Sequence, residues 1–147
     1  MDGIKVPTAT LKPLAVMRVK LGESAPVGAG PNGNRLIINV VAADVTSDRL
    51  SATLAGVAAA DWATIGEGTL IALDVRLTLK TDDGEYIYVE YCGRGDLATG
   101  LLATAPTFQT GSEKYKWLNE VQAVAAGNAN LATGDLVYQL YEVKVTV

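Results

Sequence analysis

The sequence predicts an all-β, antiparallel fold in a single domain. Short runs that alternate apolar and polar residues, or that are rich in β-branched residues, are separated by Gly, Asn, Asp and Pro, as strands are separated by tight turns. No amphipathic helical pattern of about ten residues lies between them, which argues against a parallel α/β sheet. The spacing of the runs suits a sandwich or a closed barrel. At 147 residues, we expect one domain that spans residues 1–147.

The expected strands follow one another along the whole chain. They are residues 14–21, 35–42, 49–57, 69–80, 86–93, 116–126 and 136–146. Two stretches rich in small residues, 58–65 and 96–106, interrupt this pattern, and either could hold a helical turn. The second stretch is the best candidate for a mobile flap, because long connections in compact domains are often functional.

The composition excludes several classes of function. The chain has no histidine, which rules out Ser-His-Asp and Cys-His nucleophilic sites and His-ligated metal sites. Cys92 is the only cysteine and is interpreted as a small buried hydrophobe. The net charge of −4, without a basic cluster, argues against nucleic acid as a partner. No apolar run is long enough for a membrane span and no signal peptide is recognisable, so we expect a cytoplasmic protein without a membrane partner.

Residues 28–33, GAGPNG, match the G-x-G-x-x-G spacing of dinucleotide-binding folds. That motif requires a strand before it and a helix after it, so that the helix N-terminus meets the pyrophosphate. Here the segment leads directly into the apolar run RLIINVV, and Pro-Asn-Gly is strong turn chemistry by itself. We therefore interpret this segment as a turn.

Residues 74–91, DVRLTLKTDDGEYIYVEY, read as one β-hairpin whose register depends on the loop length. A loop of two residues would place Glu90 opposite Leu77, among the leucines. A loop of three residues, 82–84, with Gly84 in the left-handed conformation, makes one face of the hairpin wholly apolar, and this register is predicted. The apolar face then pairs Leu79 with Ile87, Leu77 with Val89 and Val75 with Tyr91.

The opposite face of the hairpin gathers charges, because Arg76 lies directly opposite Glu90 and Asp74 is two residues away on the same side. Tyr88 shares this face. One interpretation is a solvent-facing surface with a salt bridge that contributes about 0–1 kcal/mol. The other is that this face lines a barrel wide enough for a ligand, while the apolar face is covered by other elements or by a second subunit.

Six segments in order carry a family resemblance. They are KPLAVMRVKLGE near the start, the turn and Arg of GPNGNR, Ala60-Asp61-Trp62, LDVRLTLKTDDGEYIYV, PTFQTGSEKYKWLN and VYQLYEV. Their order and spacing, over most of the chain, resemble the DUF3237 family of small single-domain proteins. The resemblance implies an all-β fold, a single antiparallel β-barrel of about seven or eight strands with short helical turns in its loops.

The resemblance also implies a class of chemistry. Some relatives look like cofactor-free cyclases of natural-product biosynthesis, which close an oxygen heterocycle by adding a hydroxyl across an alkene or an activated double bond. This reaction needs a base, an acid or cation, and an apolar pocket that holds the chain in a reactive geometry. We therefore expect a cyclase or isomerase that acts on a small apolar secondary metabolite without cofactor or metal.

Asp74, Arg76 and Glu90 are the expected catalytic residues. Asp74 or Glu90 could take the hydroxyl proton if burial raises its pKa, and Arg76 could hold an enolate or phenolate oxygen by paired hydrogen bonds. The expected substrate-binding residues are aromatic and polar side chains, namely Asp61, Trp62, Tyr88, Phe108, Thr110, Tyr115, Trp117 and Asn119. Core packing for the aromatics and turn capping for Asp61 and Asn119 are the alternatives.

Three alternatives stay open at this point. Residues 115–123 are either extended, or Ser112 caps a helical turn in which Tyr115 and Leu118 pair. The protein is either a catalyst or a non-catalytic barrel that binds a small molecule. It is also a possible homo-oligomer, in which the apolar hairpin face is a subunit contact.

Overall fold

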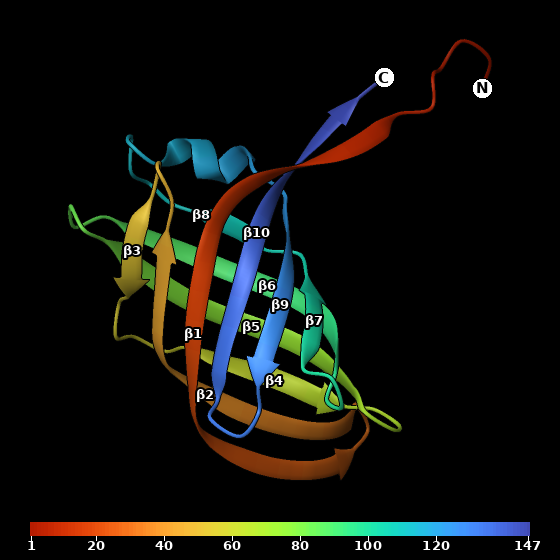
Figure 1. Cartoon of the computed structure of the whole chain (residues 1–147), viewed down its shortest axis with the longest axis vertical. Helices are drawn as coiled ribbons and strands as arrows, with labels where there is room; N and C mark the ends of the chain where they lie inside the picture. Colours follow the sequence, from red (N-terminus) through yellow and green to blue (C-terminus); the bar gives the residue numbers. More distant parts are fainter.

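Ten β-strands and one short 3-10 helix, η1, make up the computed structural model, which describes residues 1–147 (Figure 1). The elements are β1 (Thr8–Gly30), β2 (Gly33–Thr46), β3 (Ser51–Leu54), β4 (Ala60–Ile65), β5 (Leu70–Thr81), β6 (Tyr86–Asp96), β7 (Leu101–Thr104), β8 (Thr107–Gln109), η1 (Lys116–Glu120), β9 (Ala123–Asn130) and β10 (Asp135–Thr146). No helix of the chain has the length and apolar character that a membrane crossing requires.

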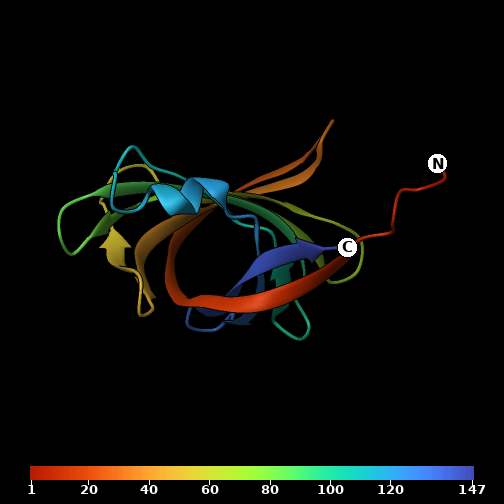
Figure 2. The ribbon, with the colours of Figure 1, turned by 90° about the horizontal axis from the view of Figure 1, so that it is seen from above.

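The strands form one antiparallel sheet that closes on itself. Neighbours follow the order β3-β5-β4-β2-β1-β10-β9-β7-β6-β8, and β5 also pairs with β6, which joins the two sides of the sheet. Viewed from above, the strands surround a central interior (Figure 2). The predicted all-β antiparallel barrel is therefore confirmed, with more strands than the seven or eight expected.

The strand count is higher because two positions in the barrel wall are each shared by two short strands. β4 pairs with residues 34–39 of β2, whereas β3 pairs with residues 44–46 of the same strand. In the same way, β7 pairs with residues 93–95 of β6 and β8 with residues 88–90. Ten strands therefore occupy eight positions around the wall, a number that side chains can fill.

Three of the expected element assignments are wrong. Residues 60–65 form strand β4 and residues 101–104 form strand β7, where the sequence suggested helical turns or a flap. Small side chains allow close packing on the inner side of a wall, and this tertiary pairing overrides their weak strand preference. Residues 116–120 are η1, and the strand expected from residue 116 begins at Ala123. Tyr115 and Leu118 are both buried, as the helical alternative predicted, but the Ser112 side chain does not cap η1.

The predicted hairpin register is confirmed. Leu79 pairs with Ile87 and Arg76 with Glu90, and Gly84 has φ of +91° in the three-residue turn. The apolar face points into the barrel, so the idea that this face is a subunit contact is wrong. The charged face consequently lies on the outside, because alternate residues of a barrel strand point to opposite sides.

The segment GAGPNG is the turn between β1 and β2, as predicted. Gly30 pairs with Gly33 at the end of the ladder, and both Gly28 and Gly33 have φ of +93°, which only glycine adopts without strain. No helix follows, and the chain continues directly as β2.

Packing inside the barrel depends on a glycine opposite a tyrosine. Gly127 pairs with Tyr138, and a Cβ atom at residue 127 would lie 2.6 Å from Tyr138 Cε1. The Tyr138 side chain is fully buried, so an added methyl group at residue 127 would have to displace a core ring or the strand that carries it.

We predict that Gly127→Ala lowers the free energy of unfolding by about 1–3 kcal/mol, because it overpacks this contact. Urea denaturation of the variant and the wild type measures the effect. Gly111→Ala is the matched control, since a Cβ at residue 111 meets nothing within 4 Å. Equal losses in the two variants would contradict the proposed contact.

Candidate functional site

The structure divides the predicted site residues among three places. Trp62, Asp74, Arg76, Tyr88 and Glu90 lie on the outer face of the wall; Asp61 points into the barrel; Phe108, Thr110, Tyr115, Trp117 and Asn119 lie around β8 and η1, at one end of the barrel. The eleven residues therefore do not form one site.

The outer-face group is an exposed surface cluster. Arg76 Nη2 is 3.6 Å from Asp74 Oδ2, both side chains are 47% exposed, and the guanidinium carbon lies 4.4 Å from the centre of the Trp62 ring. Tyr88 Oη donates a hydrogen bond of 3.0 Å to Glu90 Oε2. The expectation that this face lines the barrel interior is wrong, because the inward positions of the same strands carry Val75, Leu77, Val89 and other core residues. A catalytic role for Asp74, Arg76 and Glu90 stays a prediction.

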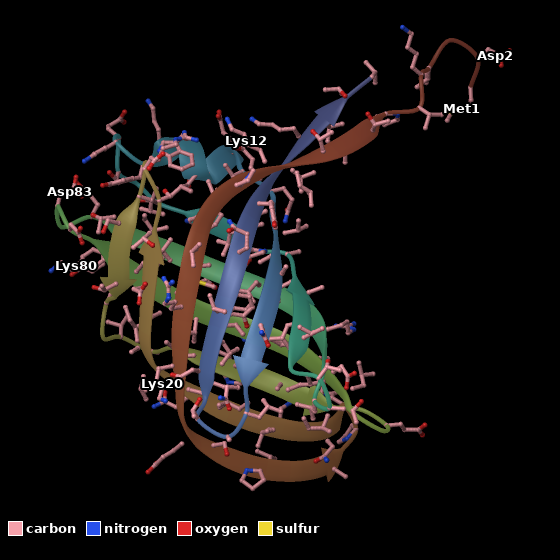
Figure 3. The ribbon with its side chains drawn as sticks, in the orientation of Figure 1. Met1, Asp2, Lys12, Lys20, Lys80 and Asp83 are labelled. Carbon is pink, nitrogen blue, oxygen red and sulfur yellow. The ribbon has the colours of Figure 1, made fainter.

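The group at the end of the barrel uses its polar atoms within the chain. Asn119 accepts a hydrogen bond of 2.8 Å from the Thr110 N–H and donates one of 2.9 Å to the Thr110 carbonyl. Tyr115 Oη donates to Asp83 Oδ1 at the tip of the β5–β6 turn (Figure 3). Phe108 is a core residue. These contacts hold η1 over one end of the barrel (Figure 1), which is a structural role that needs no ligand.

Asp61 is the one carboxylate on the inner side of the wall. It pairs with Ile38 on β2 and with Val75 on β5, and only 5% of its surface is exposed. Its Oδ1 accepts a hydrogen bond of 2.9 Å from the backbone N–H of Asp74. On the neighbouring residue, the Trp62 carbonyl accepts a hydrogen bond of 2.7 Å from Arg35 Nη1. Side chains thus form hydrogen bonds with backbone groups in the segment where β4 and β5 are not paired with each other, around residues 62 and 63.

Burial raises the pKa of Asp61 from 3.8 to about 6. Removal from water disfavours the charged carboxylate, and the negative charge of Asp74 acts in the same direction, whereas the hydrogen bond from the Asp74 N–H opposes them. A carboxylate with this pKa can both accept and return a proton near neutral pH.

Two tyrosines share the interior with Asp61. The rings of Tyr91 and Tyr138 meet edge to face, with centroids 5.7 Å apart and an interplanar angle of 64°. Burial is the main cause that raises the pKa of both phenols, and the charge of Asp61 adds to it. Both hydroxyls therefore stay protonated at neutral pH and can donate hydrogen bonds.

Two buried hydroxyls of the interior have no partner in the chain. Tyr138 Oη is near the Tyr91 hydroxyl but outside hydrogen-bond geometry with it, and Thr104 Oγ1 on β7 is also unpartnered. Buried polar groups are nearly always hydrogen-bonded, so each of these two hydroxyls is a position at which a ligand atom or a water molecule can bind. Asp61, Tyr91, Thr104 and Tyr138 together are the candidate site, which we call the interior polar site.

The apolar residues at one end of the barrel are less completely buried than the core around this site. Inward-facing apolar residues there are only partly buried, namely Leu21, Ile38, Ile65, Leu97, Leu102 and Ala129. On the inner side of β4, Asp61 is followed by Ala63 and then by Ile65, each two residues further along the strand. No three Asp, Glu or Cys side chains of the chain gather in a way that could hold a metal ion.

Sequence reasoning missed Tyr91, Thr104 and Tyr138. The predicted register did place Tyr91 on the apolar face of the hairpin, and a buried tyrosine hydroxyl normally needs a partner. That signal could have identified Tyr91 as a polar group inside the barrel. β7 pairs with β6 and β10 pairs with β9 across short turns, but the two hairpins meet only through the pairing of β7 with β9, which no local signal in the sequence encodes.

A family model described as a protein of unknown function, DUF3237, matches residues 9–103 and 95–143. The chain belongs to the DUF3237 family. A UPF0311 protein of Bradyrhizobium diazoefficiens is 31% identical over 136 residues, which cover 82% of this chain and 88% of that protein. A UPF0311 protein of Rhodopseudomonas palustris is 27% identical in an alignment that covers 93% of this chain and 98% of that protein.

Solved structures with the same fold include a β-barrel-like protein of Acinetobacter baumannii. It is 26% identical, with a TM-score of 0.84 over 95% of this DUF3237 chain and 99% of its own. A conserved protein of unknown function from Rhodopseudomonas palustris gives a TM-score of 0.84 at 24% identity, over 95% and 100% of the two chains. An enzyme of Penicillium herquei gives 0.69 at 20% identity, over 98% and 99%. The family resemblance found in the sequence is thereby confirmed.

The buried Asp61 predicts a pH dependence of stability. As pH rises above 3.8, the unfolded chain loses this proton before the native protein does, so stability falls until the native carboxyl also ionises near pH 6. A shift of about two pKa units corresponds to about 3 kcal/mol lost between pH 4 and pH 7.

Urea denaturation at several pH values measures this effect. Asp61→Asn keeps an acceptor for the Asp74 N–H but has no proton to lose, so its stability should lack the fall. Asp48→Asn, at an exposed aspartate, is the matched control and should follow the wild type. If the free energy of unfolding changed with pH in the same way in the wild type and in Asp61→Asn, the raised pKa of Asp61 would be contradicted.

Proposed function

We propose that this DUF3237 protein is a cofactor-independent acid–base catalyst of the cyclase or isomerase type, which acts on a small, largely apolar metabolite at the interior polar site. The observation that carries the proposal is the carboxylate of Asp61, buried among apolar residues with a pKa of about 6 and accompanied by protonated phenols. Groups with pKa values displaced toward working pH are typical of proton-transfer sites.

The site offers each part of an oxygen-ring closure. Asp61 takes the proton of a substrate hydroxyl, the oxygen forms a bond to the distal carbon of an activated double bond, and the electron pair of that double bond moves to the conjugated carbonyl oxygen. The hydroxyl of Tyr138 or Tyr91 donates a hydrogen bond to this enolate oxygen. The proton held by Asp61 then returns to carbon, which restores the carboxylate and completes an isomerisation without loss or gain of atoms.

Two further facts support the proposal without deciding it. The barrel fold is shared with an enzyme of Penicillium herquei, and at 20% identity this likeness concerns the fold alone. The Asp61 carboxylate lies in an apolar environment, in which fixed hydrogen-bond donors act more strongly on a developing charge than they do in water. The exposed cluster of Asp74, Arg76 and Glu90 lacks such an environment, so we assign the base to Asp61.

A non-catalytic barrel that binds a small molecule is the second candidate. The unpartnered hydroxyls of Thr104 and Tyr138 favour it, because they suit recognition of a polar ligand atom as well as they suit catalysis. In that case the same molecule binds and leaves unchanged.

The ring closure of 2′-hydroxychalcone to flavanone is a suitable probe reaction, followed by the loss of chalcone absorbance above the uncatalysed rate. We predict that kcat/KM rises with pH through about 6, where Asp61 of the free protein ionises. Asp61→Asn should lower kcat by about a hundredfold or more, since a positioned general base contributes at least that factor.

Two further variants complete the test. Asp48→Asn should leave kcat unchanged, whereas loss of turnover in Asp74→Asn with full activity in Asp61→Asn would move the base to the outer face and overturn our assignment. Flavanone that binds in calorimetry, without any turnover of chalcone, would support the binding protein in place of the enzyme.

A further inference from the structure

The inner wall of the barrel carries three hydroxyls on one arc. The arc runs over β6, β7, β9 and β10, which pair in this order. Tyr91 on β6, Thr104 on β7 and Tyr138 on β10 are 3%, 5% and 0% exposed. Asp61 lies on the other side of Tyr91, since it pairs with Val75 and Val75 pairs with Tyr91. The carboxylate and the hydroxyl of Thr104 thus occupy different parts of the same inner wall.

The methyl group of Thr104, and not its hydroxyl, packs against β6. Thr104 pairs with Gly93 on β6 and with Ala125 on β9. A Cβ atom at residue 93 would lie 2.6 Å from Thr104 Cγ2, so the methyl group covers Gly93. The hydroxyl therefore points elsewhere, and it is buried without a hydrogen-bond partner. This is an unfavourable state for a hydroxyl unless a ligand or water completes it.

The ring of Tyr138 reaches across β9 toward the strand of Thr104. It starts on β10 and covers Gly127 on β9, because a Cβ atom at residue 127 would lie 2.6 Å from Tyr138 Cε1. Its edge-to-face contact with Tyr91 shows that the ring extends toward β6. The inward-facing residues of β9 beside the ring are Ala125 and Gly127. No side chain larger than a methyl group therefore lies on the wall between this ring and Thr104.

A hollow of about 1270 Å³ comes close to this part of the wall. Ala129 and Leu136 line the hollow, and they are the next inward-facing residues after Gly127 on β9 and before Tyr138 on β10. Val19, which pairs with Leu136 and is buried in the core, lines it as well. The hollow therefore offers room for the apolar body of a molecule whose polar atom reaches the hydroxyls.

We infer that Thr104 determines substrate specificity at the interior polar site, because its hydroxyl and that of Tyr138 bind one carbonyl oxygen of the ligand. A carbonyl oxygen has two lone pairs and no proton, so it accepts hydrogen bonds from both hydroxyls at once. The inference rests on the proposed function for the identity of this oxygen, which is the one that becomes the enolate oxygen during ring closure. Two fixed donors stabilise the developing charge more than one does.

This arrangement names the class of substrate. A hydroxy ketone with a conjugated double bond places its carbonyl between Thr104 and Tyr138 and its hydroxyl near Asp61. A hydroxy alkene without a carbonyl would leave both buried hydroxyls unpaired. Sites built to hydrogen-bond a substrate group discriminate strongly against analogues that lack this group. The site should therefore select activated double bonds and reject simple alkenes.

Equilibrium binding of flavanone and flavan tests the role of Thr104 without turnover, because flavan lacks the carbonyl. The wild type should bind flavanone about tenfold or more tightly than flavan. Thr104→Val removes the hydroxyl and keeps the methyl group, so it should weaken flavanone binding by about tenfold or more and leave flavan binding unchanged. Thr104→Ser should retain most of the affinity for flavanone, and Tyr138→Phe should show the same selective loss as Thr104→Val.

Thr78→Val is the matched control. It makes the same chemical change on the outer face of β5 and should alter neither affinity. Because the Thr104 hydroxyl has no partner in the free protein, Thr104→Val should also leave the midpoint of urea denaturation unchanged or raise it, which separates lost recognition from lost folding.

Three results would overturn the inference: equal weakening of both ligands in Thr104→Val, no weakening of flavanone binding, or a wild type that does not bind flavanone. Turnover of 2′-hydroxychalcone separates this inference from the proposed function. Selective loss of flavanone binding in a protein that converts no chalcone would refute the enzyme and keep the role of Thr104. Turnover that depends on Asp61, with flavanone affinity independent of Thr104, would refute the role of Thr104 alone.

Discussion

The pairing of β5 with β6 is the constraint on which the rest of the structure depends. Gly84 at φ of +91° allows the three-residue turn that sets this register, and the register decides which face of the hairpin enters the barrel. A shift of one residue would turn Arg76 and Glu90 inward and expose Leu77 and Val89. Because β4 pairs with β5, and β7 and β8 pair with β6, the same register fixes the inward positions of the neighbouring strands.

The interior polar site depends on that register, which makes the inward-facing positions mostly apolar. Asp61 is the charged residue among them. Asp61 points inward because it pairs with Val75, which faces the core, although a buried carboxylate weakens the fold above pH 6. Only one backbone N–H compensates for its lost hydration, and two hydroxyls of the interior have no partner at all. Natural proteins keep such unfavourable groups mainly where function needs them, which is the physical basis for our proposal that this group of residues is a functional site.

The two ends of the barrel differ in how they are covered. At one end, η1 buries Leu118 and is held by hydrogen bonds between Asn119 and Thr110 and between Tyr115 and Asp83. At the other end, inward-facing apolar residues such as Leu21, Ile38 and Ile65 are only partly buried.

The sequence by itself determined the antiparallel β class, the hairpin register and the turn at Gly28–Gly33, because alternation and turn residues act over short distances. It also carried the family, through the order of its segments. Only the tertiary structure decided that the charged hairpin face points outward and that Asp61, Tyr91 and Tyr138 are buried in the same barrel interior. Local alternation defines two faces but cannot say which one is enclosed, since enclosure depends on strands far apart in the chain closing into one wall. The pKa of Asp61 likewise comes from burial by these distant strands, which no short stretch of sequence encodes.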